Sequence, residues 1–143
     1  LVREKFVLRP DLVGTPNPEI ARLSAQGEEV NTLVREPLMS FTGDTTPEGL
    51  ANDEFARSAR VIVTELSFLG GKERATVETA RMGMHTHIDE FLDIMDLLRC
   101  DTVVFMHLSR KYSVREAEEI LHARIPQKWE GRWRFLHHED RRA

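Results

Sequence analysis

The sequence predicts an α/β fold with buried strands. Short apolar runs rich in β-branched residues recur along the chain, and segments with the spacing of amphipathic helices separate them. This alternation is typical of a layered α/β protein. The predicted elements are a helix over 18–26, a strand over 37–43, a short helix over 48–57, a strand over 60–66, a helix over 86–99, a strand over 102–107, a helix over 113–123 and a strand over 131–136.

Local signals define the first elements. Asn17 is a good helix cap, Pro18 suits the first helical position, and Gly27 is a natural helix stop. The strand that follows ends at Gly43. The run Val61-Ile62-Val63 is typical of a buried strand.

The later helices have capping signals and apolar stripes. Thr86 is expected to cap the helix over 86–99, and Ser113 opens a capping box with Glu116. Both helices should therefore pack one face against the sheet. The predicted inward residues are Ile88, Phe91, Leu92, Met95 and Leu98 in the first helix and Val114, Ala117, Ile120 and Leu121 in the second.

Composition limits the class of protein. A chain of 143 residues is the size of one domain, so residues 1–143 are predicted to form a single domain. The net charge of −4 excludes a strongly basic nucleic-acid binder, although a local basic patch is compatible with it. The longest apolar run, 103–106, is too short for a membrane span. The single cysteine, Cys100, excludes an intrachain disulfide and indicates a reducing, cytoplasmic compartment.

Three polar residues stand at the ends of predicted strands. Asp44 follows the first strand, Glu65 ends the second, and His107 ends the third. In layered α/β folds, ligands gather at the carboxyl ends of strands, and these residue types serve as metal ligands or acid–base groups. Each also has a structural interpretation: a turn aspartate, a buried ion pair and a core histidine.

The other histidines leave alternatives open. His85 and His87 would share a face and could chelate a metal on a strand, but they would diverge at a helix start. His122 is expected on an exposed helix face. His137 and His138, beside charged residues, are expected in a solvated tail. Because the chain begins with leucine, it need not be a whole gene product.

Four motifs follow one another along the chain. They are Phe-Thr-Gly-Asp-Thr at 41–45, Thr-Glu-Leu-Ser-Phe at 64–68, Met-His-Thr-His at 84–87 and His-Leu-Ser-Arg-Lys-Tyr at 107–112. They resemble, in order, Phe-Thr-Gly-Asp-Thr, His-Glu-Ala-Thr-Phe, the plant-type Gly-His-Ile-His and His-Phe-Ser-x-Arg-Tyr. These belong to ribonuclease Z, the tRNA 3′-processing endonuclease of the metallo-β-lactamase superfamily. The resemblance covers nearly the whole chain, but only the C-terminal half of that family, most closely its plant-type short form.

The resemblance implies the C-terminal half of an αββα sandwich that supplies the second half of a zinc-dependent phosphodiesterase site. Asp44 would bridge two zinc ions, and His107 would ligate one of them. His85, oriented by Glu65, would donate a proton to the leaving 3′ oxygen. The two metals would stabilise the charged transition state during cleavage of precursor tRNA.

The chain departs from the family pattern in ways that affect its activity. No histidine precedes His85, so the His-x-His-x-Asp-His motif that supplies most zinc ligands is absent. The two ligands that remain, Asp44 and His107, cannot hold two zinc ions. The sequence therefore does not predict that this chain alone is active. Lys111 replaces the arginine of the last motif, Met84 replaces a glycine, and Thr64 replaces a histidine.

The expected partners follow from the missing half. The N-terminal half of the fold would come from the same or another chain, and the family implies a homodimer without a membrane. Half a sandwich should also expose one apolar face of its sheet. Two alternatives stay open: a non-catalytic half-fold acting as a scaffold, RNA-binding or dimerisation module, and another metallo-β-lactamase-fold hydrolase.

Overall fold

The computed structural model describes residues 1–136, and its contacts divide the chain into two compact units. Unit 1 comprises Leu1–Glu36 and unit 2 comprises Pro37–Ala143. The division concerns contacts within this chain, and the single domain over residues 1–143 stays a prediction. His137 and His138 lie outside the described residues.

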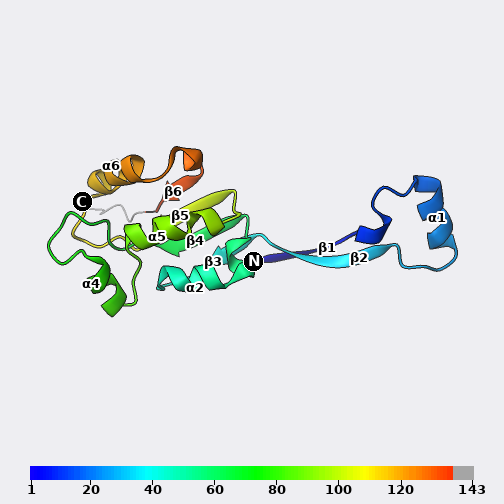
Figure 1. Cartoon of the computed structure of the whole chain (residues 1–143), viewed down its shortest axis with the longest axis horizontal. Coiled ribbons are helices and arrows are strands. Elements are labelled where there is room, and N and C mark those ends of the chain that lie inside the picture. The colour runs from blue at the N-terminus through cyan, green and yellow to red at the C-terminus, as the bar shows by residue number, and fades with distance from the viewer. Residues whose placement is uncertain (137–143) are drawn as a thin grey trace, which may run out of the picture. The chain divides into compact units, whose positions relative to one another are not determined.

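Unit 1 is built on a two-stranded sheet of β1 (Val2–Leu8) and β2 (Asn31–Pro37). The connecting segment carries a short 3-10 helix, η1 (Pro10–Leu12), and helix α1 (Asn17–Ala25), as Figure 1 shows. The helix prediction is confirmed, but Asn17 is its first residue rather than its cap. Gly27 lies just beyond the C-terminal end of α1. Its φ is 85°, a conformation that glycine adopts readily and that ends the helix.

Unit 2 contains a four-stranded parallel sheet in the order β3-β4-β5-β6, which confirms the predicted α/β class. Helical segments connect each strand to the next, and no helix within residues 1–136 combines the length and apolar character of a membrane span. Its elements are β3 (Met39–Phe41), α2 (Pro47–Asn52), α3 (Glu54–Arg57), β4 (Val61–Glu65), α4 (Val77–Met82), α5 (Ile88–Ile94), the 3-10 helix η2 (Met95–Leu97), β5 (Thr102–Met106), α6 (Val114–Arg124), the 3-10 helix η3 (Gln127–Trp129) and β6 (Trp133–Phe135).

Capping explains where the observed helices differ from the predicted ones. The helix expected over 48–57 is interrupted at Asp53, whose side chain accepts a hydrogen bond from Ala56 N and starts α3. Thr86 does not cap α5. Instead, His87 is the cap, and its Nδ1 accepts a hydrogen bond from Asp89 N at 3.1 Å. The predicted cap of α6 is confirmed, since the Ser113 side chain accepts a hydrogen bond from the first turn.

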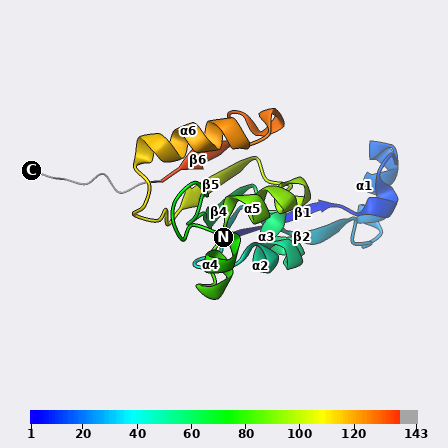
Figure 2. The ribbon, with the colours of Figure 1, turned by 60° about the vertical axis from the view of Figure 1, so that its left-hand side comes forward.

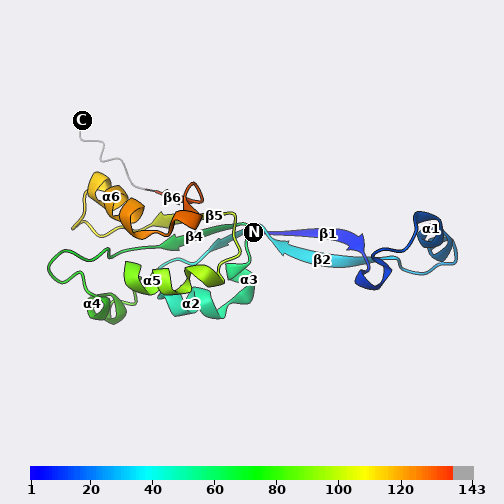
Figure 3. The same cartoon turned by 45° about the horizontal axis from the view of Figure 1, so that its top comes forward.

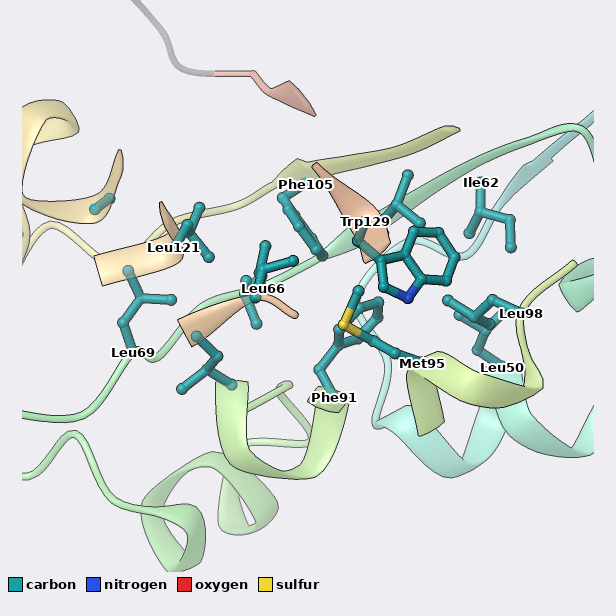
Figure 4. Packing of buried hydrophobic residues seen from close by; sticks show 14 of the residues in the cluster. Leu50, Ile62, Leu66, Leu69, Phe91, Met95, Leu98, Phe105, Leu121 and Trp129 are labelled. Atoms are coloured by element: carbon teal, nitrogen blue, oxygen red, sulfur yellow. The ribbon is translucent and has the colours of Figure 1, made fainter. Parts of the chain in front are cut away.

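The core lies on one face of the sheet. Figure 4 shows Phe91 of α5 and Met95 of η2 gathered with Phe105 of β5 and Trp129 of η3. The rings of Phe91 and Phe105 pack edge to face, with their centroids 5.1 Å apart. Helix α6, which runs beside β6 in Figure 2, adds Leu121 to the same cluster. Burying these side chains is the main stabilising contribution to unit 2.

The opposite face of the sheet is less covered. Figure 3 shows α2, α3 and α5 along one side of the strands. On the other side, Met39 and Phe41 are 44% and 63% exposed, and Val61, Val63 and Val104 are only half-buried. Parallel sheets are normally covered on both faces. The exposed apolar residues therefore agree with the open face expected for half of a sandwich.

Cys100 offers a test of this packing. Its thiol is 1% exposed, and burial raises its pKa to about 11. Because the thiolate is the reactive form, we expect the native protein not to react with a thiol-specific disulfide reagent at about pH 8. One thiol per chain should react after denaturation, as measured by absorbance of the released chromophore. Rapid labelling of the native protein would contradict the observed packing.

Candidate active site

Four predicted side chains meet at one edge of the sheet. Asp44 lies in the loop after β3, Glu65 is the last residue of β4, and His107 directly follows β5. His85 lies in the segment between α4 and α5. Because β3, β4 and β5 are neighbouring parallel strands, their carboxyl ends lie at the same edge. The structure thus brings together residues that are up to 63 positions apart, from Asp44 to His107.

Glu65 is the shared hydrogen-bond acceptor of this cluster. Its side chain is completely buried. Its Oε2 lies 2.7 Å from Ser67 Oγ, 2.9 Å from His85 Nδ1 and 3.2 Å from His107 Nδ1. Its Oε1 accepts a hydrogen bond from Thr45 N at 2.8 Å. A buried carboxylate requires such partners, and here they are imidazoles, a hydroxyl and a backbone amide rather than a lysine or arginine.

The two imidazoles approach Glu65 in the same way. With Glu65 Oε2 as the acceptor, the contacts assign the Nδ1–H tautomer to both His85 and His107. No hydrogen bond within residues 1–136 uses Nε2 of either ring, and the rings are 27% and 45% exposed at the side chain. Their centroids lie 5.2 Å apart. Each Nε2 is therefore available to a metal or a substrate, in the carboxylate–histidine arrangement common at metal sites.

The backbone at His107 is unusual. Its φ of 63° lies in the left-handed region, which residues other than glycine rarely adopt. Conformations of this kind are concentrated at functional sites. Here the conformation accompanies a His107 side chain directed at Glu65 and Ser67.

Asp44 completes the group. Its carboxylate is 63% exposed, and its Oδ1 lies 3.8 Å from His107 Nδ1. The next residue, Thr45, is held on both sides, because its N–H donates to Glu65 and its carbonyl accepts from Thr86 Oγ1 at 2.8 Å. Asp44 thus sits at the sheet edge on a loop anchored by buried side chains.

His87 is not part of the site. It is buried, with Nδ1 capping α5 and Nε2 within 3.2 Å of Ala75 O. His85 and His87 therefore diverge, as expected for a helix start rather than a strand. His122 is exposed as predicted, and its ring packs against Trp133 at a centroid distance of 4.8 Å.

The donor set can be compared with the needs of a metal ion. Ligand atoms of Glu65, His85 and His107 lie within 4.8 Å of one another, and Asp44 adds a carboxylate beside them. Imidazole nitrogen and carboxylate oxygen suit zinc and similar divalent ions. These residues fit part of such a site. They do not by themselves supply the donors that two zinc ions require.

Sequence reasoning missed two hydroxyl-bearing residues, Ser67 and Thr86. Ser67 stands two positions beyond Glu65, and in an extended segment this spacing places both side chains on the same side. That signal could have identified Ser67. The sequence predicts Thr86 as the helix cap, a role that His87 takes in the structure.

No family model matches this chain. It is 32% identical to "tRNase Z TRZ1" of Arabidopsis thaliana over 130 residues, which cover 90% of this chain and 45% of that protein. It is 33% identical to "tRNase Z TRZ2, chloroplastic" of the same plant over 103 residues, which cover 71% of this chain and 28% of that protein. The matched region therefore spans less than half the length of either relative.

Proposed function

We propose that this chain supplies one half of the active site of a zinc-dependent endoribonuclease that acts at the 3′ end of precursor tRNA. The chain is ribonuclease Z-like over nine-tenths of its length. The observation that carries the proposal is the cluster at the sheet edge. Buried Glu65 contacts two imidazoles at Nδ1 and leaves their Nε2 atoms available, and Asp44 Oδ1 lies 3.8 Å from His107 Nδ1. The names of the two relatives support the substrate class.

The geometry supports a division of roles among the four residues. Glu65 already accepts four hydrogen bonds, so it orients the imidazoles rather than binding metal. Asp44 and His107 then act as metal ligands, with two zinc ions in the complete site. When bound, the metals would stabilise charge on the phosphodiester. His85 holds a proton at Nε2 for the leaving oxygen, while its Nδ1–H stays on Glu65.

The rest of the site would come from the N-terminal half of the fold, in the same or another chain. Two observations support this partner. The open sheet face carries exposed Met39 and Phe41, and more than half of the length of each relative lies outside the match. We further propose a homodimer and a cytoplasmic location. The latter is supported by the single, unpaired cysteine, Cys100.

Native mass spectrometry of the protein purified from its source tests the proposal. We expect two zinc ions on a species heavier than the 16.5 kDa of this chain. That species should release the 3′ trailer from a precursor tRNA. A metal-free species of 16.5 kDa would overturn the proposal in favour of a non-catalytic module. Hydrolysis of a simple phosphodiester without tRNA cleavage would instead indicate a different hydrolase of the superfamily.

His85→Ala separates the proton donor from the metal ligands. We expect this variant to cleave precursor tRNA about 100-fold or more slowly, the contribution typical of general acid catalysis, with its zinc content unchanged. Zinc is measured by mass spectrometry of the metal and cleavage by gel electrophoresis. Loss of zinc from this variant would make His85 a ligand and contradict the division of roles.

Gly83 provides a milder test of the same histidine. A Cβ at this position would lie 2.9 Å from His85 Cδ2, closer than non-bonded atoms approach. Gly83→Ala should therefore displace the ring from Glu65 and slow cleavage by about 10-fold or more, as at other sites where the orientation of a functional histidine is disturbed. Single-turnover cleavage assays measure this effect. Met82→Ala, at an 80% exposed position in the same segment, should retain the wild-type rate.

A further inference from the structure

We propose that Thr86 is a positioning residue that fixes the loop carrying Asp44. This inference rests on the proposed function, because it concerns how the metal ligand Asp44 is placed. Thr86 is 1% exposed, and its Oγ1 donates a hydrogen bond to Thr45 O at 2.8 Å. The bond joins the segment before α5 to the loop after β3, across 41 positions of the sequence.

The two polar groups of Thr45 are held by different buried side chains. Its N–H donates to Glu65 Oε1 at 2.8 Å, and its carbonyl accepts from Thr86 Oγ1 at the same distance. The peptide that links Asp44 to Thr45 is therefore held through its N–H. The hydrogen bond to the carbonyl of Thr45 restricts rotation of that residue's backbone. Within residues 1–136, the 63% exposed side chain of Asp44 makes no comparable contact, so it depends on this backbone for its position.

In the part of the chain that the structure describes, the Thr86 hydroxyl makes no hydrogen bond other than the one to Thr45 O. His87 caps α5 in its place. The backbone carbonyl of Thr86 accepts hydrogen bonds from Ser67 N and Phe68 N, so the main chain is held independently of the side chain. Thr86 is thus anchored to the segment after β4, while its hydroxyl reaches the loop after β3. A change confined to the hydroxyl should act on the Asp44 loop and leave α5 intact.

Two substitutions isolate the hydroxyl. Thr86→Val keeps the β-branched shape and removes the donor, whereas Thr86→Ser keeps the donor and removes a methyl group. Tyr112→Phe is the control, because it also removes a hydroxyl that donates to a backbone carbonyl, that of Gly70 at 2.7 Å, although this hydroxyl additionally accepts from Leu69 N at 3.1 Å. The first measurement is hydrogen exchange of the Thr45 amide in the metal-free full chain. The second is the zinc affinity of the zinc-bearing assembly.

We expect Thr86→Val to speed exchange of the Thr45 amide by about 10-fold, the scale of one hydrogen bond. Zinc affinity should fall by about 10-fold or more, as for other residues that hold metal ligands. Thr86→Ser should behave like the wild type, and Tyr112→Phe should change neither quantity.

Unchanged exchange, or unchanged zinc affinity, in Thr86→Val would overturn the inference. An equal loss of zinc affinity in Tyr112→Phe would also overturn it, by showing a general effect of destabilisation. Failure of the proposed function has a different signature. In that case the wild-type assembly itself would bind no zinc, while exchange of the Thr45 amide would still report on the Thr86 bond.

Discussion

Replacing Asp44 with alanine is expected to abolish cleavage of precursor tRNA and to leave the fold intact. The carboxylate is 63% exposed, and its Oδ1 lies 3.8 Å from His107 Nδ1. Substitutions at exposed positions of this kind change the free energy of unfolding by about 0.5 kcal/mol or less. Loss of the proposed metal ligand should cost more than the roughly 10- to 100-fold typical of residues that only orient metal ligands. Cleavage rate, zinc content and urea denaturation together measure the effect.

Asp93→Ala is the matched control for this experiment. Asp93 is an exposed aspartate on α5, outside the site cluster. We expect the control to retain zinc, activity and stability. If Asp44→Ala cleaves as fast as the wild type and keeps its zinc, the assignment of Asp44 as a metal ligand is wrong.

The substitution Glu65→Ala should have the broadest effect of any in the site. It removes the acceptor for Thr45 N, Ser67 Oγ and the two imidazoles at once, and it leaves a cavity at the end of β4. Unsatisfied buried donors and a new cavity together should lower the free energy of unfolding by about 2–4 kcal/mol. Cleavage should fall by more than about 100-fold, because both functional histidines lose their orientation. Denaturant unfolding and cleavage assays on the same preparation measure both effects.

Glu65→Gln separates stability from chemistry. Glutamine fills the same volume and can still accept a hydrogen bond from Thr45 N through its oxygen. Its amide group then faces the imidazole Nδ1–H groups, and two donors repel. We expect most of the stability to return while cleavage stays low. A fully active Glu65→Gln variant would show that the charge and acceptor capacity of Glu65 are not needed to orient His85 and His107.

Strands β3 to β6 could be predicted because their signals are local. Strands β4 and β5 contain apolar runs, at 61–63 and 103–106, and Gly43 and Gly131 bound the segments predicted for β3 and β6. Strands β1 and β2 also contain short apolar runs, at 6–8 and 33–34, but charged residues adjoin them. Arg3 and Lys5 pair with Glu36 across the strands, and these exposed ion pairs break the apolar pattern. Helix α4 has six residues, too few to show helical periodicity.

The candidate site was predictable to a similar extent. Asp44, Glu65 and His107 stand at strand ends in the sequence, and a parallel sheet necessarily brings such ends together. Thr86 shows why the hydroxyl-bearing residues of the site could not be predicted in the same way. Its neighbours along the chain indicate a helix cap, whereas its hydroxyl bonds a carbonyl 41 positions away. A contact of this kind depends on packing between segments and leaves no periodic trace in the sequence.

The pairing of β4 with β5 has a consequence for assembly. Glu65 is aligned with Met106, so His107 directly follows the last paired residue. A slip of one residue between these strands would shift His107 by about 3.3 Å along the sheet and turn neighbouring side chains to the opposite face. Misaligned chains would then present separated donors and bind metal weakly. Metal binding would therefore stabilise the correctly aligned sheet over the misaligned one, because only the properly paired sheet would gain the binding energy of the ion.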